Sequence, residues 1–225
     1  MKATSVVAIA ASAGGVDAIK EVLKSFVPGE DTAVCVLIHI PANRESGLPK
    51  LFQRVTSAKV CDAKEGLPLE GGSVYVAPAG RHLEITADGL LHLSSAPKRH
   101  FTRPSAEHLF STASAAFGDR TVLVVLTGYG RNGSESLRDC KDAGALIIVQ
   151  DPLTAKIPSM PMAAIATGCA DFVLPLDKIP AKIAELCNRR GEENPPQTSQ
   201  LASGPSASDP EHPTRGSGAS APTEN

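Results

Sequence analysis

A serine in a glycine turn is the first residue of this chain that could do chemistry. Ser12 lies in the pentapeptide 11–15, Ala-Ser-Ala-Gly-Gly, between the apolar run 6–10 and a helical pattern that starts at Val16. A strand, a tight turn and a helix in that order place the hydroxyl beside the first-turn N–H groups of the helix, where negative charge is stabilised. This favours a nucleophile whose reaction passes through an oxyanion. A phosphate-binding turn and a plain strand-to-helix connection are the alternatives, because the pentapeptide matches no familiar fingerprint.

Two further polar side chains are expected near that serine. His39 lies at the end of the next apolar run, and Asn132 lies in the segment 127–133, Thr-Gly-Tyr-Gly-Arg-Asn-Gly, which follows a later run. Polar residues at the carboxyl ends of parallel strands gather at one edge of the sheet. A general base must reach the hydroxyl that it activates, so the shared edge favours His39 as that base. The alternative is a histidine that makes a structural hydrogen bond at a strand end.

Apolar runs and helical patterns alternate along the chain, which predicts an α/β fold with a doubly wound, mostly parallel sheet and helices on both faces. Two short runs around Asp88-Gly89, 82–85 and 91–93, predict a small antiparallel hairpin beside it. The expected strands are 6–11, 34–40, 73–77, 122–127, 145–149 and 172–174. The expected helices are 16–26, 45–55, 105–117, 134–143, 160–167 and 176–187.

The chain is expected to form one folded domain, residues 1–190, followed by a disordered tail, residues 191–225. The tail has no aromatic residue and a single large aliphatic one, Leu201, among many Pro, Ser, Gly, Ala and Glu residues. Such a segment cannot bury enough apolar surface to offset the entropy lost on ordering.

Composition argues against several functional classes. The net charge is −2, aromatic residues make up 4% of the chain and tryptophan is absent, so no nucleic-acid partner is expected. No apolar run approaches the roughly 20 residues of a membrane span. The five cysteines form no CxxC pair, and three lie in apolar stretches as small core residues, which indicates a reduced, cytoplasmic protein. No HExxH pattern or His/Cys/Asp cluster is present, and neither a metal nor a cofactor is expected.

Taken together and in order, these motifs resemble the CheB-type methylesterase domain of bacterial chemosensory systems. The resemblance runs from about Val6 to Leu186. It also includes a proline-containing motif ahead of the helix at 105 and, in the last third of the chain, a Met-Pro pair followed by 163–165, Ala-Ala-Ile. Its residues are Ala11 to Gly15, Ile38-His39-Ile40-Pro41, Leu126 to Gly133, Arg103-Pro104-Ser105 and Met160-Pro161.

The resemblance implies a serine hydrolase that removes methyl esters from modified glutamates on the cytoplasmic helices of chemoreceptors and often deamidates their glutamines. Ser12 would be the nucleophile, His39 the base, and Asn132 would stand at the third triad position, which is normally aspartate. Methylated chemoreceptor helices are the expected partner, and the sequence does not indicate an oligomeric state. The oxyanion and substrate loops are expected at Ala13, Gly14, Tyr129 and Gly130.

Asn132 is the main departure from the family pattern. An amide carries no charge to stabilise an imidazolium, and its NH₂ group can select the wrong histidine tautomer. Three hypotheses follow. In the first, activity survives at a reduced level, or a nearby carboxylate, Glu135 or Asp151, replaces the missing aspartate. In the second, the domain is a catalytically impaired protein that binds receptors or other partners. In the third, deamidation of Asn132-Gly133 restores an aspartate.

Two smaller departures concern regulation and the substrate groove. Family members commonly carry an N-terminal receiver domain, whereas the first strand here is expected at Val6; control by phosphorylation in cis is therefore expected to be absent if the chain is complete. Ser159 stands where the family tends to have glycine, and Tyr129 where it usually has methionine. Both substitutions are expected to narrow or reshape the groove.

Overall fold

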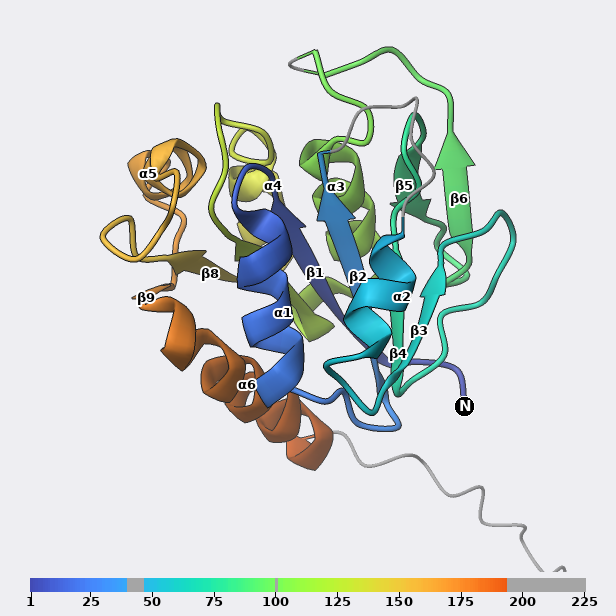
Figure 1. Cartoon of the computed structure of the whole chain (residues 1–225). Coiled ribbons are helices and arrows are strands. Elements are labelled where there is room, and N and C mark those ends of the chain that lie inside the picture. Colours follow the sequence, from blue (N-terminus) through green and yellow to red (C-terminus); the bar gives the residue numbers. More distant parts are fainter. Residues whose placement is uncertain (40–46, 100, 194–225) are drawn as a thin grey trace, which may run out of the picture. The chain divides into compact units, whose positions relative to one another are not determined.

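Seven parallel strands form the central sheet of this chain, whose computed structural model describes residues 1–39, 47–99 and 101–193 (Figure 1). The strand order is β3-β4-β2-β1-β7-β8-β9, so β1 lies at the centre between β2 and β7. The strands are β1 Ser5–Ala11, β2 Thr32–Ile38, β3 Lys59–Asp62, β4 Ser73–Val76, β7 Thr121–Val125, β8 Leu146–Gln150 and β9 Phe172–Leu174.

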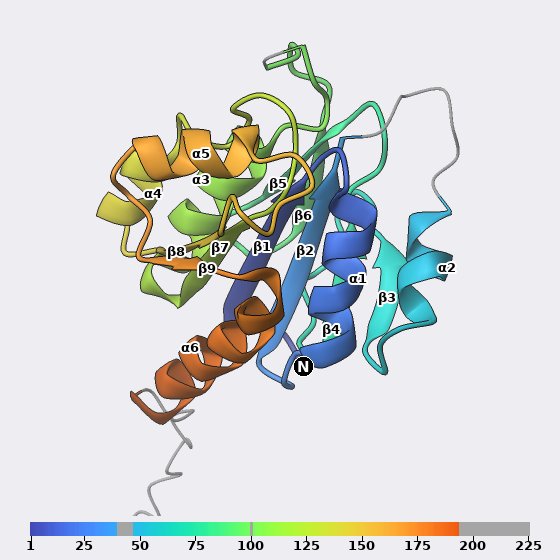
Figure 2. The ribbon, with the colours of Figure 1, turned by 60° about the vertical axis from the view of Figure 1, so that its left-hand side comes forward.

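Helices cover both faces of this sheet (Figures 1 and 2). One face packs against α1 (Gly15–Ser25), α2 (Leu48–Gln53) and α6 (Ile179–Glu193). The other packs against α3 (Ala106–Phe117), α4 (Leu137–Asp142) and α5 (Ser159–Ala166). Alternate side chains of β1 enter the two core clusters, which explains why this strand is apolar at every position rather than at every second one. The predicted α/β fold with a mostly parallel sheet is confirmed.

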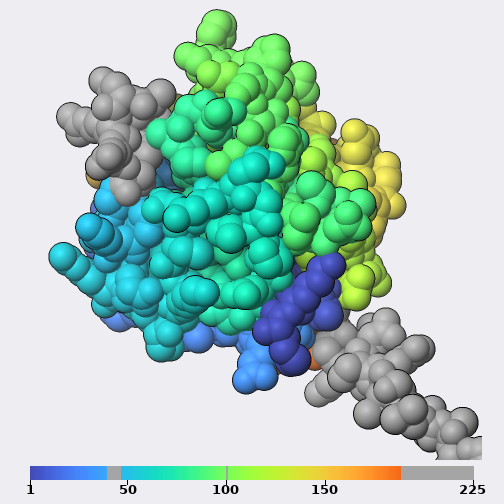
Figure 3. Space-filling view, turned by 90° about the vertical axis from the view of Figure 1, so that its right-hand side faces the viewer, coloured from blue at the N-terminus to red at the C-terminus, as the bar shows by residue number. Residues whose placement is uncertain are grey.

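The predicted hairpin is present as a separate two-stranded antiparallel sheet. It consists of β5 (His82–Ile85) and β6 (Leu91–Ser94), joined by a turn in which Gly89 has a φ of 71°. Apolar side chains of both strands join the core cluster on the α3 face, so the hairpin extends that core. On the side of the molecule shown in Figure 3, the cyan-to-green surface consists largely of the segment from α2 to this hairpin.

Some predicted boundaries were wrong. The strand β3 was missed because it is a half-exposed edge strand of mixed composition with no continuous apolar run. The helices α2 and α4 are only six residues long, and the predicted helical segment at 176 begins as a 3₁₀ turn, Leu176–Lys178. The last helix, α6, continues to Glu193, three residues past the predicted domain end. The rest of the predicted tail, 194–225, and the predicted ends of two elements, Ile40 and 45–46, lie outside the described residues.

Cysteine placement follows the sequence interpretation. All five are thiols, and Cys35, Cys140 and Cys169 are buried. Burial raises the pKa of Cys35 to about 12, which keeps this thiol protonated and unreactive. Among the described residues, no helix combines the length and the hydropathy that a membrane crossing requires.

Candidate active site

The ends of three adjacent strands bring the candidate residues to one edge of the sheet. Ala11 at the end of β1 pairs with Ile38 at the end of β2, so Ser12 and His39 leave their strands at the same level. The His39 N–H donates to the Ala11 carbonyl at 3.2 Å, and the Ser12 N–H donates to the Thr127 carbonyl, just after β7, at 2.9 Å. The predicted gathering of these segments at one sheet edge is therefore observed in the backbone hydrogen bonds.

The turn that carries Ser12 is fixed by its own backbone and by a threonine. Gly14 has a φ of 80° and is the N-cap of α1, a left-handed conformation that favours glycine. The Gly15 N–H donates to the Ser12 carbonyl at 2.8 Å, and the Thr127 hydroxyl donates to the Ala13 carbonyl at 3.0 Å. The serine thus lies just before the N-cap of an 11-residue helix, in a loop tied to the neighbouring strand end.

A second loop, 128–130, lies beside this turn and is held by Ser159. The Ser159 hydroxyl donates to the Gly128 carbonyl at 3.0 Å and accepts the Gly130 N–H at 3.0 Å. The Gly130 N–H is therefore engaged within the protein, whereas the Tyr129 side chain is 67% exposed. Ser159 therefore holds both ends of the loop that was predicted to help stabilise an oxyanion.

Gly128 makes a close approach that sequence analysis did not single out. A Cβ placed on it would lie 2.7 Å from the Ser12 Cβ and against the Met160 sulfur. We expect Gly128→Ala to reduce the free energy of unfolding by about 1–3 kcal/mol through overpacking and to displace Ser12. Urea unfolding and labelling of Ser12 by a fluorophosphonate probe measure the two effects.

The matched control is Gly47→Ala, because Gly47 has ordinary backbone angles and nothing within 4 Å of its added Cβ. This control should leave both measurements unchanged. Labelling of Gly128→Ala at the wild-type rate would show that Ser12 tolerates the intrusion.

Asn132 lies at the centre of a buried hydrogen-bond network and is only 4% exposed. Its Oδ1 accepts the Ala106 N–H, at the start of α3, at 2.6 Å. Its Nδ2 donates to Thr102 Oγ1 at 2.8 Å and to Ser105 Oγ at 3.2 Å. The side chain therefore joins the loop after β7 to the N-terminus of a helix 26 residues earlier in the chain.

The partners of this carboxamide determine which of its atoms can serve the histidine. The Thr102 hydroxyl donates to the Arg99 carbonyl at 2.9 Å and the Ser105 hydroxyl to Glu107 Oε2 at 2.6 Å, so both accept from Asn132. Both amide protons are thereby used, and Oδ1 is the atom left to face an imidazole N–H. The unfavourable orientation considered from the sequence, with NH₂ toward the ring, would break this network.

His39 is half-buried, and its Nε2 has no hydrogen-bond partner among the described residues. Burial lowers the pKa of the imidazole below its usual 6.5, while the Asn132 side chain and the Glu107 carboxylate act in the opposite direction. The ring is therefore neutral at physiological pH, as a general base requires. Among the three residues considered for the third triad position, Asn132, Glu135 and Asp151, it is Asn132 whose side chain raises the pKa of the ring.

The carboxylate that raises the pKa of His39 is Glu107, whereas the two proposed from the sequence are engaged elsewhere. Glu135 forms an ion pair with Arg131 at 2.6 Å, and the Asp151 carboxylate caps the turn after β8 by accepting the Leu153 N–H at 2.9 Å. Glu107 was missed because an acidic residue in the first turn of a helix is usually a solvated capping residue. The sequence feature that could have indicated Glu107 is its position two residues after Ser105, the last residue of the motif 103–105.

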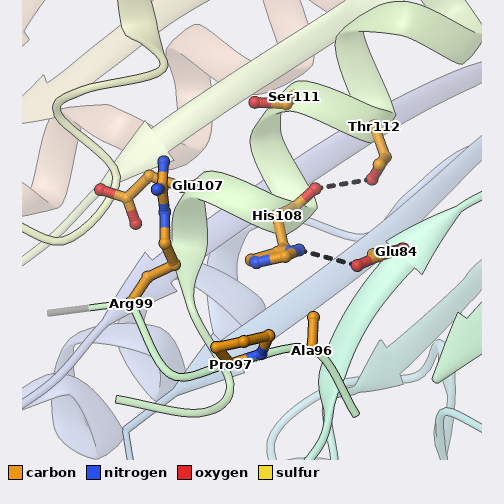
Figure 4. A pocket seen from close by; sticks show the side chains of 8 residues that line it. All are labelled: Glu84, Ala96, Pro97, Arg99, Glu107, His108, Ser111 and Thr112. Carbon is orange, nitrogen blue, oxygen red and sulfur yellow. Dashed lines mark hydrogen bonds and ion pairs between the residues drawn. The ribbon is translucent and has the colours of Figure 1, made fainter. Parts of the chain in front are cut away.

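Glu107 also lines a pocket of about 450 Å³ beside this network (Figure 4). The pocket lies between the first turns of α3, the strand β5 and the loop 96–99. On its wall, His108 Nδ1 lies 2.7 Å from Glu84 Oε1, and Arg99 comes from the loop. Within the described part of the chain, no group of three or more His, Cys, Asp or Glu side chains is arranged to hold a metal ion.

The comparison with protein families identifies one match, "CheB methylesterase", over residues 7–183. A relative from Pyrococcus abyssi, named "Protein-glutamate methylesterase/protein-glutamine glutaminase", is 38% identical over 180 residues, which cover 79% of this chain and 49% of the relative. A Leptospira interrogans relative whose name carries the same two activities is 36% identical over 188 residues, covering 84% of this chain and 95% of the relative. The chain spans about half the length of the Pyrococcus abyssi relative and of further relatives that it matches.

A solved structure has the same fold. The crystal structure of the Thermotoga maritima CheB methylesterase catalytic domain superposes with a TM-score of 0.75 at 28% sequence identity. The match covers 81% of this chain and 98% of that domain, so nearly all of the Thermotoga domain has a counterpart here.

Proposed function

This chain belongs to the CheB methylesterase family, as its motifs predicted, and from that premise we propose that it is a protein-glutamate methylesterase that acts on methylated chemoreceptor helices. The observation that carries the proposal is that Ser12, His39 and the Asn132 loop follow the ends of β1, β2 and β7 respectively, which are neighbours in the sheet. We propose deamidation of receptor glutamines as a second reaction of the same groups, because the relatives' names include a protein-glutamine glutaminase activity.

The proposed reaction begins when His39 removes the Ser12 proton as the hydroxyl oxygen attacks the ester carbonyl. The tetrahedral oxyanion forms at the start of α1, where the helix dipole and first-turn N–H groups favour negative charge. The imidazolium of His39 then protonates the leaving methoxide, methanol departs and an acyl-serine remains. Water, activated by the same imidazole, hydrolyses the acyl-serine and restores the free glutamate.

Asn132 has the role of holding the imidazole during this cycle. With both amide protons donated to hydroxyls, its Oδ1 presents a partial negative charge to a ring N–H, which orients the ring and favours the imidazolium that forms. An amide oxygen stabilises an imidazolium less than a carboxylate does. We therefore expect a lower turnover than in an otherwise identical enzyme with aspartate at position 132.

The direct test is methanol release from a methylated receptor fragment incubated with the wild-type chain, with ammonia release from an unmethylated fragment as the measure of deamidation. Release of methanol in proportion to enzyme supports the esterase. A folded wild type that binds the fragment and releases no methanol would overturn the proposal in favour of a receptor-binding role.

The lowered pKa of His39 predicts the acid side of the pH profile. Protonation of His39 removes the base, so activity is present when the ring is neutral and is lost as pH falls through its folded pKa. Because burial lowers that pKa, we expect the midpoint of the acid limb to lie below 6.5. Methanol release measured between about pH 5 and about pH 8 reports this midpoint; a value at or above 6.5 would contradict the assignment of His39 as a buried base.

A further inference from the structure

We propose that Glu107 is a positioning residue of this site and supplies, through Ser105, the negative charge that position 132 lacks. The inference rests on the proposed function, because it concerns how the same histidine is supported. Because an amide at the third position carries no charge, the imidazolium of His39 needs another source of negative charge.

Both oxygens of the Glu107 carboxylate are committed to the loop and the side chain of Asn132. Oε1 accepts the Gly133 N–H at 2.6 Å, which holds the backbone of the residue that follows Asn132. Oε2 accepts the Ser105 hydroxyl at 2.6 Å, and that hydroxyl in turn contacts the Asn132 side chain. Glu107 is only 4% exposed, so these hydrogen bonds form where water screens them little.

The hydrogen bonds have one direction, from the amide toward the carboxylate. The Ser105 hydroxyl lies 2.6 Å from Glu107 Oε2 and 3.5 Å from Asn132 Oδ1, so its single proton is donated to the carboxylate. Its lone pair then accepts from Asn132 Nδ2. A chain of this kind polarises each member, draws positive charge toward the Nδ2 side of the amide and leaves more negative charge on Oδ1. The buried carboxylate thus acts on the imidazole both directly and through the amide.

The electrostatics of His39 are in agreement with this geometry. The Glu107 carboxylate raises the pKa of the imidazole against the larger lowering effect of burial. Other polar groups line the pocket with Glu107: Arg99 from the loop, and His108, whose Nδ1 lies 2.7 Å from Glu84 Oε1. Among the hydrogen bonds of the described residues, none joins the side chains of Arg99, His108 or Glu84 to the Asn132 carboxamide.

The same network bears on the deamidation hypothesis. Conversion of Asn132-Gly133 requires the Gly133 nitrogen to attack the Asn132 side-chain carbon. Here that N–H is bound by Glu107 and the carboxamide is held by three partners, which opposes the rearrangement. Glu107 therefore protects the amide while it compensates for its missing charge.

The decisive variant is Glu107→Gln, which keeps the shape and removes the charge. We expect the His39 pKa to fall by roughly one unit, the size of effect expected for a nearby opposite charge, and methanol release at neutral pH to fall by about tenfold at saturating substrate, with KM unchanged. An NMR titration of the imidazole, assigned with His39→Gln, reports the pKa without any requirement for activity.

Two further variants separate charge from structure. Glu84→Gln makes the same change on the opposite pocket wall and should leave both the His39 pKa and methanol release at wild-type values. Ser105→Ala keeps the charge and breaks the hydrogen-bond chain, so it should lower methanol release with a smaller pKa change. If Glu107→Gln does not fold, as judged by thermal unfolding, Ser105→Ala and Glu107→Asp test the proposal instead. Reduced methanol release by Ser105→Ala and partly retained methanol release by Glu107→Asp would support the role of Glu107; unchanged release by Ser105→Ala would contradict it.

The outcomes also distinguish this inference from the proposed function. A wild type that releases methanol, with a His39 pKa and turnover unmoved by Glu107→Gln, would overturn the role of Glu107 alone. A wild type that releases none would overturn the esterase, and the NMR titration would still show whether Glu107 supports the imidazole.

Discussion

Ser12→Ala is expected to reduce methanol release by about 10³-fold or more, because the acyl-enzyme route depends on this hydroxyl as the attacking atom. The residual rate would come from binding and oxyanion stabilisation alone, which remain when the nucleophile is removed. Substrate affinity should stay close to the wild-type value, since the change removes one oxygen at the start of α1. The measurement is initial rates of methanol release with a methylated receptor fragment.

The loss must be chemical rather than structural. The Ser12 side chain is half-buried, and its backbone, not its hydroxyl, makes the contacts with Thr127 and Gly15. The free energy of unfolding should therefore change by roughly 0.5 kcal/mol or less. Ser25→Ala, at the exposed far end of the same helix, is the control and should retain full activity. Methanol release by Ser12→Ala at more than a tenth of the wild-type rate would rule out Ser12 as the nucleophile.

Asn132→Asp is expected to raise turnover by about tenfold, because a carboxylate beside His39 stabilises the imidazolium more than an amide oxygen does. The gain in turnover should stay well below ~10⁴-fold, which is the loss of turnover when asparagine replaces the triad aspartate of a serine protease. In this protein the Glu107 carboxylate already stabilises the imidazolium of His39, so the second carboxylate of the Asn132→Asp variant adds less than it would alone. The kcat at neutral pH, measured by methanol release, is the quantity to compare.

The same change is expected to cost stability. Ser105 has one hydroxyl proton, which cannot serve the Glu107 carboxylate and a second carboxylate at once. One buried oxygen then loses a donor, and two like charges share a buried site, which we expect to lower the free energy of unfolding by about 1–3 kcal/mol. Asn188→Asp, on the exposed surface of α6, is the matched control and should change neither property.

A double-mutant cycle links the two largest effects at the imidazole. If Glu107 and position 132 act on one proton, Glu107→Gln should cost less in the Asn132→Asp background than in the wild type. Additive effects would show that Glu107 and position 132 do not act on one proton. A fall in turnover on Asn132→Asp alone would show that the amide is the better partner for this histidine. Either result would contradict the charge argument.

Local sequence was sufficient for the parts of this protein that depend on near neighbours. Each buried strand of a two-faced sheet must be apolar along its length, so β1, β2 and β7 were evident as runs, and the polar residues that follow them had to meet at one edge. The glycine turn around Ser12 and the hairpin of β5 and β6 are likewise set by residues a few positions apart. These elements were predicted because their physical causes lie within a single segment.

The support of His39 depends on contacts that only the tertiary structure makes. Gly133 and Glu107 are 26 residues apart in the chain, as are Asn132 and Ala106, and no local pattern distinguishes a buried first-turn glutamate from a solvated one. The sequence therefore determined that a hydroxyl, an imidazole and an amide share one sheet edge. Packing of α3 against that edge decided which way the amide points and which carboxylate stands behind it, because hydrogen-bond direction follows from partners that folding brings together.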